Sequence, residues 1–179
     1  MLVWEKPCNC NLECAHTLET LIRATGPEYC SAFIAEPVVG ATLGTVSAPE
    51  RYFQIIRDIY NRYGILFIAD EVKTGLGRTG KRWGLEHWEV KPDIIATAKA
   101  LSSGYLSLGA TIASDDIYEV FGEPFAHGHT YGSHPVACAA GAATLDYLIR
   151  NKLVERSAKL GGYLHEKLQD LYDLQSVGD

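Results

Sequence analysis

The sequence predicts an α/β protein in which a mostly parallel sheet is flanked by helices. Short apolar runs alternate along the chain with longer segments whose apolar residues recur at helical spacing, an order typical of parallel sheets with helical crossovers. Of the 179 residues, 47% are hydrophobic and 21% are charged, as in ordinary soluble globular proteins. A compact chain of this length buries roughly 70% of the surface that its unfolded form exposes. We therefore expect one core.

The first part of the chain contains two helix patterns and two strand patterns. Residues 13–23 carry apolar side chains at helical spacing and predict a helix. Residues 31–35 form a short apolar run that stops at Pro37, as expected for a buried strand that ends in a loop. An apolar stripe along residues 50–63, closed by a glycine, predicts the clearest helix of the chain. Residues 65–69 are continuously apolar, the pattern of a strand covered on both faces.

The second part of the chain predicts two more strands and two helices. The short apolar segments 93–97 and 108–113 are candidate strands. A helix of small residues is expected from Pro135 to about residue 150, and another from residue 153 towards residue 174. Because ligands bind beyond the carboxyl ends of parallel strands, functional side chains should follow these strand ends.

The charge and composition disfavour several classes of partner. Lys and Arg number 16 against 22 Asp and Glu, a formal net charge of −6, and the basic residues are scattered, which argues against nucleic acid and against an anionic membrane surface. No secretory signal and no run of the ~20 apolar residues that cross a bilayer occur, so we expect no membrane and a cytoplasmic location. The five cysteines, an odd and sparse set, are interpreted as reduced thiols.

Two groups of potential metal ligands occur, and neither is favoured as a metal site. The cysteine group lacks the paired knuckle spacing of structural zinc sites, so incidental thiols are the simpler interpretation. The histidine group includes no carboxylate or cysteine, and histidines in a glycine-rich loop often bind backbone groups instead. The groups are Cys8, Cys10 and Cys14 with His16, and His127 and His129 with His134.

Gly75, Gly77 and Gly80 match the pattern G-x-G-x-x-G, which can mark a dinucleotide site. The context of the motif differs from a Rossmann turn, because residues 70–74 separate it from the preceding strand and residues 81–84 do not open a helix directly. A glycine-rich surface loop is favoured over a nicotinamide-dependent oxidoreductase, which stays as an alternative.

Lys99 stands at the end of an apolar strand, where we expect it to be desolvated. Burial disfavours an ammonium and favours the neutral amine that Schiff-base chemistry needs. The alternative is a lysine whose amine extends from the strand end into solvent.

Asp70 follows another buried strand, and a carboxylate at such a position is costly unless a cation meets it. A protonated pyridine nitrogen is such a cation. Asp70 and Lys99 could therefore bracket a pyridoxal ring, with its nitrogen at one side and its aldehyde at the other.

The chain resembles the class III pyridoxal-phosphate-dependent aminotransferases of fold type I from about residue 14 to residue 179. Several motifs occur in that family's order. They are Ala35-Glu36-Pro37-Val38-Val39-Gly40; Asp70-Glu71-Val72 with Thr74-Gly75 and Gly77-Arg78-Thr79-Gly80; Pro92-Asp93-Ile94; Ala98-Lys99; Gly104-Tyr105 with Leu108-Gly109-Ala110; and His127-Gly128-His129-Thr130-Tyr131 with His134-Pro135.

The resemblance implies a role for each matching residue. Lys99 would bind the cofactor, pyridoxal 5′-phosphate, as a Schiff base and transfer a proton, and Asp70 would keep the pyridine nitrogen protonated. Val72 would pack on the ring face. Thr130 would bind the cofactor phosphate across the interface of a homodimer with shared active sites, and Glu36 would lie on the substrate side. The family's glycine loop and histidines would then frame this one site.

This sequence also departs from the family's usual pattern in ways that bear on function. Ala100 stands where glycine commonly follows the lysine, and Gly132-Ser133 replaces the more usual Ser-Gly or Gly-Gly. Family members are much longer, and their phosphate-binding turn, ring-stacking aromatic residue and substrate-binding arginine lie outside the part matched. We therefore expect a central fragment of the large domain in residues 1–150, followed in residues 151–179 by a helix that leads towards a C-terminal small domain.

The function expected from the resemblance is a transaminase that moves an amino group from an amine or ω-amino acid to a 2-oxo acid. Two alternatives stay open. The chain could be a truncated, non-catalytic remnant that cannot retain the cofactor, or a related pyridoxal-phosphate enzyme such as an aminomutase or decarboxylase, because the cofactor performs the same electron-sink step in each.

Overall fold

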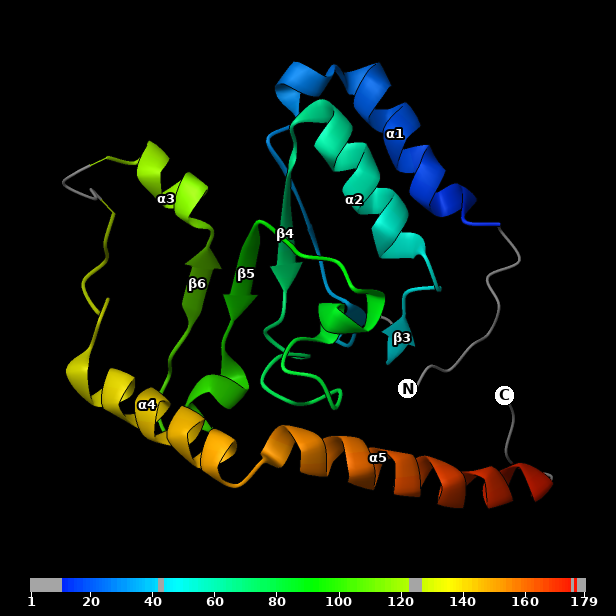
Figure 1. Cartoon of the computed structure of the whole chain (residues 1–179), viewed down its shortest axis with the longest axis vertical. Coiled ribbons are helices and arrows are strands. Elements are labelled where there is room, and N and C mark those ends of the chain that lie inside the picture. The colour runs from blue at the N-terminus through cyan, green and yellow to red at the C-terminus, as the bar shows by residue number, and fades with distance from the viewer. Residues whose placement is uncertain (1–10, 42–43, 123–126, 175, 177–179) are drawn as a thin grey trace.

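A four-stranded sheet lies at the centre of the part of the chain that the structure describes (Figure 1). The structure is a computed structural model, and it describes residues 11–41, 44–122, 127–174 and 176. The strands stand in the order β1-β4-β5-β6, in which β1 pairs with β4 and β4 with β5 in parallel, whereas β5 and β6 are antiparallel. The predicted α/β architecture with a mostly parallel sheet is therefore confirmed. The strands are β1 (Ala32–Ala35), β4 (Leu66–Asp70), β5 (Ile94–Thr97) and β6 (Ala110–Ala113).

The register of the parallel strands brings three chain segments to one edge of the sheet. Ala35 pairs with Ala69, and Asp70 pairs with Ala96. Because the three parallel strands run in the same direction, their carboxyl ends meet at that edge, where Figure 1 shows the loops that follow β4 and β5. This is the edge at which a parallel sheet binds ligands.

Helices α1 (Glu13–Thr25) and α2 (Tyr52–Tyr63) pack together beside β4 and form the main core. Both were predicted, with ends that differ by two residues at most from the sequence pattern. The left-handed Gly64 ends α2 with φ of 65°, as the glycine stop predicted. The buried core side chains include Ala15 and Ile22 of α1, Phe53, Ile56, Ile59 and Tyr60 of α2, Phe67 and Ala69 of β4, and Leu85 and Trp88.

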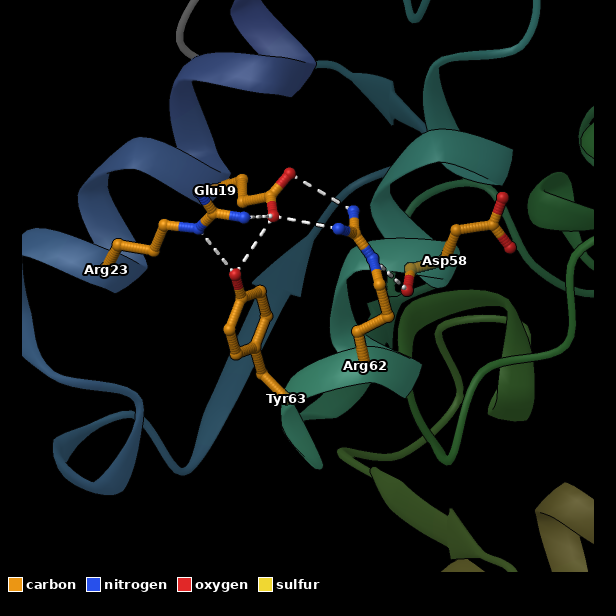
Figure 2. Close-up of polar contacts among 5 residues, drawn as sticks. All are labelled: Glu19, Arg23, Asp58, Arg62 and Tyr63. Atoms are coloured by element: carbon orange, nitrogen blue, oxygen red, sulfur yellow. Dashed lines mark hydrogen bonds and ion pairs between the residues drawn. The ribbon is translucent and has the colours of Figure 1, made fainter.

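A polar network joins the solvent side of α1 to the end of α2 (Figure 2). The Glu19 carboxylate accepts hydrogen bonds from Arg62 Nη1 at 2.8 Å, from Tyr63 Oη at 2.9 Å and from Arg23 Nη2 at 2.7 Å. Arg23 Nε also donates to Tyr63 Oη at 2.7 Å. The hydrogen bond from Tyr63 and those from Arg62 lower the pKa of Glu19 below its ordinary value.

Helices α4 (Pro135–Arg150) and α5 (Leu153–Gln169) follow each other along the carboxyl edge of the sheet (Figure 1). Between them lie Asn151 and Lys152, the latter left-handed with φ of 49°. Gly141 of α4 packs so closely on the loop after β5 that a Cβ atom there would lie 2.5 Å from Leu108 Cδ2. The helix expected to continue towards residue 174 ends at Gln169 and tightens into the 3₁₀ turn η4 (Asp170–Asp173).

Several short elements occur that no sequence pattern predicts. A small hairpin pairs the two-residue strands β2 and β3 antiparallel, and a six-residue helix, α3, follows β6. Three 3₁₀ helices also occur in the described residues before α4. The elements are β2 (Val38–Val39), β3 (Val46–Ser47), α3 (Asp115–Val120), η1 (Pro27–Tyr29), η2 (Gly84–Trp88) and η3 (Lys99–Ser102).

The prediction that the 65–69 strand is covered on both faces is wrong in part. Burial alternates along β4, with Phe67 and Ala69 fully buried against α2 and Ile68 only half-buried. Ile34, which pairs with Ile68 on the same face, is 58% exposed. The reason is that α1 and α2 pack on one side of the strand. An apolar composition alone therefore does not predict that both faces are covered. None of the helices in the described residues has the length and apolarity that a membrane span requires.

Candidate active site

Asp70 ends β4 at the carboxyl edge of the sheet and is half-buried there. Its Oδ1 accepts a hydrogen bond from the Val72 amide at 3.1 Å, which closes a tight turn after the strand. The next amide, that of Glu71, donates to the carbonyl of Ala96 at 2.9 Å and so extends the pairing of β4 with β5. The Asp70 carboxylate is thereby oriented by the backbone on either side of it.

Glu71 is a buried carboxylate, 1% exposed, to which the sequence analysis assigned no role. Its Oε2 accepts from the Gly84 amide at 2.8 Å and from Thr74 Oγ1 at 2.5 Å, and its Oε1 accepts from the Leu85 amide at 2.8 Å. These donors satisfy the carboxylate inside the protein, as a buried charge requires. The signal in the sequence is a glutamate between two predicted site residues with a threonine three residues later.

Lys99 lies two residues beyond β5, at the first position of η3, and it is exposed. The prediction of a desolvated lysine at the strand end is wrong for this structure. Thr97 is the last buried residue of the strand, at 3% exposure, and the chain then turns outward so that Lys99 takes a left-handed conformation with φ of 45°. Such a conformation is costly for a residue other than glycine and marks a position held by its surroundings.

Lys99 and Val72 line one cavity of about 440 Å³ between the β2–β3 hairpin and the loop after β4. Lys73 and Arg78 also line it, so the wall carries three basic side chains. The Thr79 hydroxyl, from the same wall, is buried without a hydrogen-bond partner among the described residues. The lining therefore suits a ligand that carries negative charge and hydrogen-bond acceptors.

The remaining two predicted site residues stand apart from this cavity. Glu36 directly follows β1 and is half-buried at the same edge of the sheet as Asp70, but it does not line the cavity. Thr130 is exposed in a turn that precedes α4. Within one chain the structure thus brings Asp70, Val72 and Lys99 to one edge, with Glu36 beside them, and leaves Thr130 outside this group.

The glycine motif after Asp70 forms a packing surface for helix α5. Gly77 and Gly80 have positive φ values of 94° and 81°. A Cβ atom on Gly77 would lie 3.2 Å from Val154 Cγ2, and one on Gly80 would lie 2.9 Å from Ala158 Cα. The motif therefore permits close approach of a helix, which agrees with the favoured interpretation as a loop rather than with a dinucleotide cradle.

No group of three metal-ligating side chains gathers within the described ranges. Cys8 and Cys10 lie outside those ranges, whereas Cys14 and His16 lie on α1. His134 caps the start of α4, where its Nδ1 accepts from the Ala137 amide at 3.4 Å. One member of the histidine group thus binds the backbone, as the alternative to metal binding predicted.

The fold defined by this sheet and its flanking helices is that of the fold type I transaminases. A transaminase from the marine bacterium Virgibacillus has a TM-score of 0.88 and 44% sequence identity to this chain, and the match covers 93% of this chain and 39% of that structure.

Residues 4–179 match the family described as aminotransferase class-III, and the chain belongs to this family. A diaminobutyrate–2-oxoglutarate transaminase of Halomonas elongata is 44% identical over 162 residues, covering 87% of this chain and 34% of the relative. A chloroplastic gamma aminobutyrate transaminase 3 of Solanum lycopersicum is 40% identical over 171 residues, covering 92% of this chain and 33% of the relative. The chain thus spans about a third of the length of these relatives.

Proposed function

We propose that this chain carries the cofactor-binding centre of a pyridoxal-phosphate-dependent transaminase that moves an amino group from an amine or ω-amino acid to a 2-oxo acid. The observation that carries the proposal is the position of Lys99 and Val72 on one basic cavity at the carboxyl edge of the sheet, beside the strand that ends in Asp70. Residues 1–150 would belong to the large domain and residues 151–179 would lead towards a small domain.

The side chains at this edge fit pyridoxal phosphate. A cavity of about 440 Å³ lies within the range that small ligands occupy. Its three basic side chains complement a phosphate or a substrate carboxylate. Asp70 uses Oδ1 for the Val72 amide, and its second carboxylate oxygen can accept a hydrogen bond from a protonated ring nitrogen.

Each residue of this edge would have a separate task. The Lys99 amine would hold the cofactor covalently and, once released, would accept and return a proton at the substrate Cα. The Asp70 carboxylate would keep a proton on the ring nitrogen, and Val72 would pack on the ring face. When bound, the cofactor supplies an electron sink for the electron pair left at the substrate carbon. The negative charge on Asp70 would strengthen that sink, because it would stabilise a protonated ring nitrogen.

The proposal includes a homodimer with shared active sites. Thr130 is exposed in its turn and would reach the cofactor phosphate of the partner subunit. Exposure supports this assignment because a hydroxyl that serves another subunit must lie on the surface of its own. Glu36 would contact the substrate side of the site from the end of β1.

The choice of substrates rests on the relatives. The two relatives described above are named for gamma-aminobutyrate and for diaminobutyrate with 2-oxoglutarate. Both names support an ω-amino donor, and the second supports a 2-oxo acid acceptor. We also propose a cytoplasmic location, which the sparse and odd set of five cysteines supports.

The experiment that tests this function is absorbance spectroscopy of the purified chain with added pyridoxal phosphate, before and after borohydride reduction, followed by peptide mapping. We expect a visible band that borohydride converts into a stable adduct on Lys99. Screening of ω-amino donors with 2-oxo acid acceptors then tests transfer. Absence of any adduct on Lys99 would contradict the proposal for this chain and favour a non-catalytic remnant.

A further inference from the structure

The Glu71 carboxylate connects the proposed cofactor edge to the protein core through the 3₁₀ helix η2. Its three hydrogen bonds end on the first two amides of η2 and on Thr74. At the other end of η2, the Trp88 ring packs edge-on against Phe53 at 5.1 Å between centroids. The helix is therefore fixed in the core at one end and holds a carboxylate at the other.

Two glycines allow the segments around Glu71 to pack closely, Gly84 beside its carboxylate and Gly75 beside its backbone carbonyl. A Cβ atom on Gly84 would lie 2.8 Å from Thr74 Cβ and 3.2 Å from Glu71 Oε2. A Cβ atom on Gly75 would lie 2.8 Å from the Glu71 carbonyl oxygen and 2.9 Å from the Trp83 ring. The close approach of these segments shows that the carboxylate sits in a fitted site with little free space.

We propose that Glu71 is a positioning residue, whose buried carboxylate holds the turn at residues 70–75 against η2 and thereby orients Asp70 and Val72 towards the cavity edge. Glu71 is buried, whereas its neighbours Asp70 and Val72 are half-buried and Val72 lines the cavity. Drawing the middle side chain inward directs the two flanking side chains the other way. The roles of Asp70 and Val72 rest on the proposed function, but the attachment of their turn by Glu71 does not.

The chemistry of the site predicts which substitution breaks it. A glutamine at position 71 has almost the same shape, but it offers one carbonyl oxygen where the carboxylate has two accepting oxygens. Its amide group would face either the Gly84 or the Leu85 amide, donor against donor, and one buried N–H would lose its acceptor. The turn should then open locally more often, while α2 and the core keep their contacts.

The test is amide hydrogen exchange of the cofactor-free chain, compared between the unmutated protein, Glu71→Gln and Glu86→Gln. Glu86 is a matched control because it is an exposed glutamate on the same η2 helix whose Oε1 accepts one hydrogen bond, from the Trp83 amide at 3.2 Å, and the glutamine carbonyl can keep that single bond. We expect exchange in residues 70–75 and 84–88 to become about tenfold faster in Glu71→Gln alone, with residues 52–63 unchanged. If Glu71→Gln does not fold, Thr74→Val removes one donor and should give a smaller acceleration in the same segments.

A second readout is the affinity for pyridoxal phosphate and the pH dependence of its bound absorbance. Glu71→Gln should weaken affinity and shift the midpoint of that pH titration, because Asp70 is no longer held at its position. If the unmutated chain binds no pyridoxal phosphate, the proposed function fails for this chain, and hydrogen exchange alone decides the role of Glu71. Unchanged exchange in residues 70–75, or faster exchange spread equally over residues 52–63, would overturn the inference.

Discussion

Lys99 is held in a left-handed backbone conformation at the start of η3, where the residue lines two cavities, of about 440 and 520 Å³. The neighbouring Ala98 continues the chain from β5 with an extended φ of −160°. Lys99 lies beyond the end of β5, so a ligand in either cavity can meet this residue without a displacement of the strand.

The substitution Lys99→Ala should abolish the visible band and the borohydride-stable adduct of added pyridoxal phosphate, because it removes the only group proposed to bind the aldehyde. Absorbance spectra and peptide mapping measure this. Lys91→Ala, which removes another exposed lysine before β5, should leave both signals unchanged. An adduct that persists in Lys99→Ala, mapped to another lysine, would refute the assignment.

Two residues show how much of the site follows from sequence. Asp70 was predicted at a strand end from the apolar run before it, and β4 does end there. The burial of Lys99 was predicted by the same reasoning, and it failed because the strand ends two residues earlier and the chain turns outward. The end of a strand can be predicted from the end of an apolar run. The exposure of the residues that follow depends on which other segments cover them, and the run itself holds no information about those segments.

At the scale of elements, the glycine loop after β4 and helix α5 form one packing unit. Gly80 has a positive φ and a Cβ atom on it would meet the backbone of Ala158. Gly104 has a similar φ of 79° but open space around its Cα. The pair therefore separates the cost of the backbone conformation from the cost of the contact.

We expect Gly104→Ala to lower the free energy of unfolding by about 1 kcal/mol, which is the cost of a left-handed conformation alone. Gly80→Ala should lower it by roughly 2 to 4 kcal/mol, because α5 must also shift to admit the methyl group. Denaturant unfolding of both variants measures the difference. Equal losses would show that the contact between Gly80 and α5 contributes nothing to stability.

The network around Glu19 predicts a pH-dependent contact between α1 and α2. Because the pKa of Glu19 is lowered in the folded protein, its contribution to stability is present above the ordinary glutamate pKa and is lost as the pH falls through the lower, folded value. Glu19→Gln should therefore lower the Tm at pH 7, and the difference from the unmutated protein should shrink on acidification below roughly pH 4. Thermal unfolding across pH, with the exposed Glu50→Gln as control, measures this.

The longer elements were predictable and the short ones were not. Helix α2 is predicted by an apolar stripe over three turns and a glycine stop. In the structure this stripe is buried in the core and the glycine ends the helix. The β2–β3 hairpin and the 3₁₀ helix η2 are too short for any period to show. What holds η2 is the carboxylate of Glu71, a contact over thirteen residues that no local pattern encodes.

At the scale of the whole molecule, the proposed shared site can be tested by mixing subunits. Lys99→Ala and Thr130→Val should each fail to bind pyridoxal phosphate tightly. After unfolding and refolding of an equal mixture, half of the dimers are hybrids with one site built from the two unmutated residues, so about a quarter of the sites should recover tight binding. Recovery is measured by absorbance titration, and refolding each variant alone gives the baseline. No recovery in a mixture shown to be dimeric would contradict a site shared through Thr130.

The two residues between α4 and α5 have a consequence for how the site loops are kept together. Gly141 of α4 rests on the loop after β5, and residues 154 and 158 of α5 rest on the glycine loop after β4. Asn151 and Lys152 form a short non-helical connection, and a residue inserted into it or removed from it would change how far α5 starts from the end of α4. Val154 and Ala158 would then no longer lie against the glycines that receive them. We therefore expect this connection to tolerate substitutions far better than insertions or deletions.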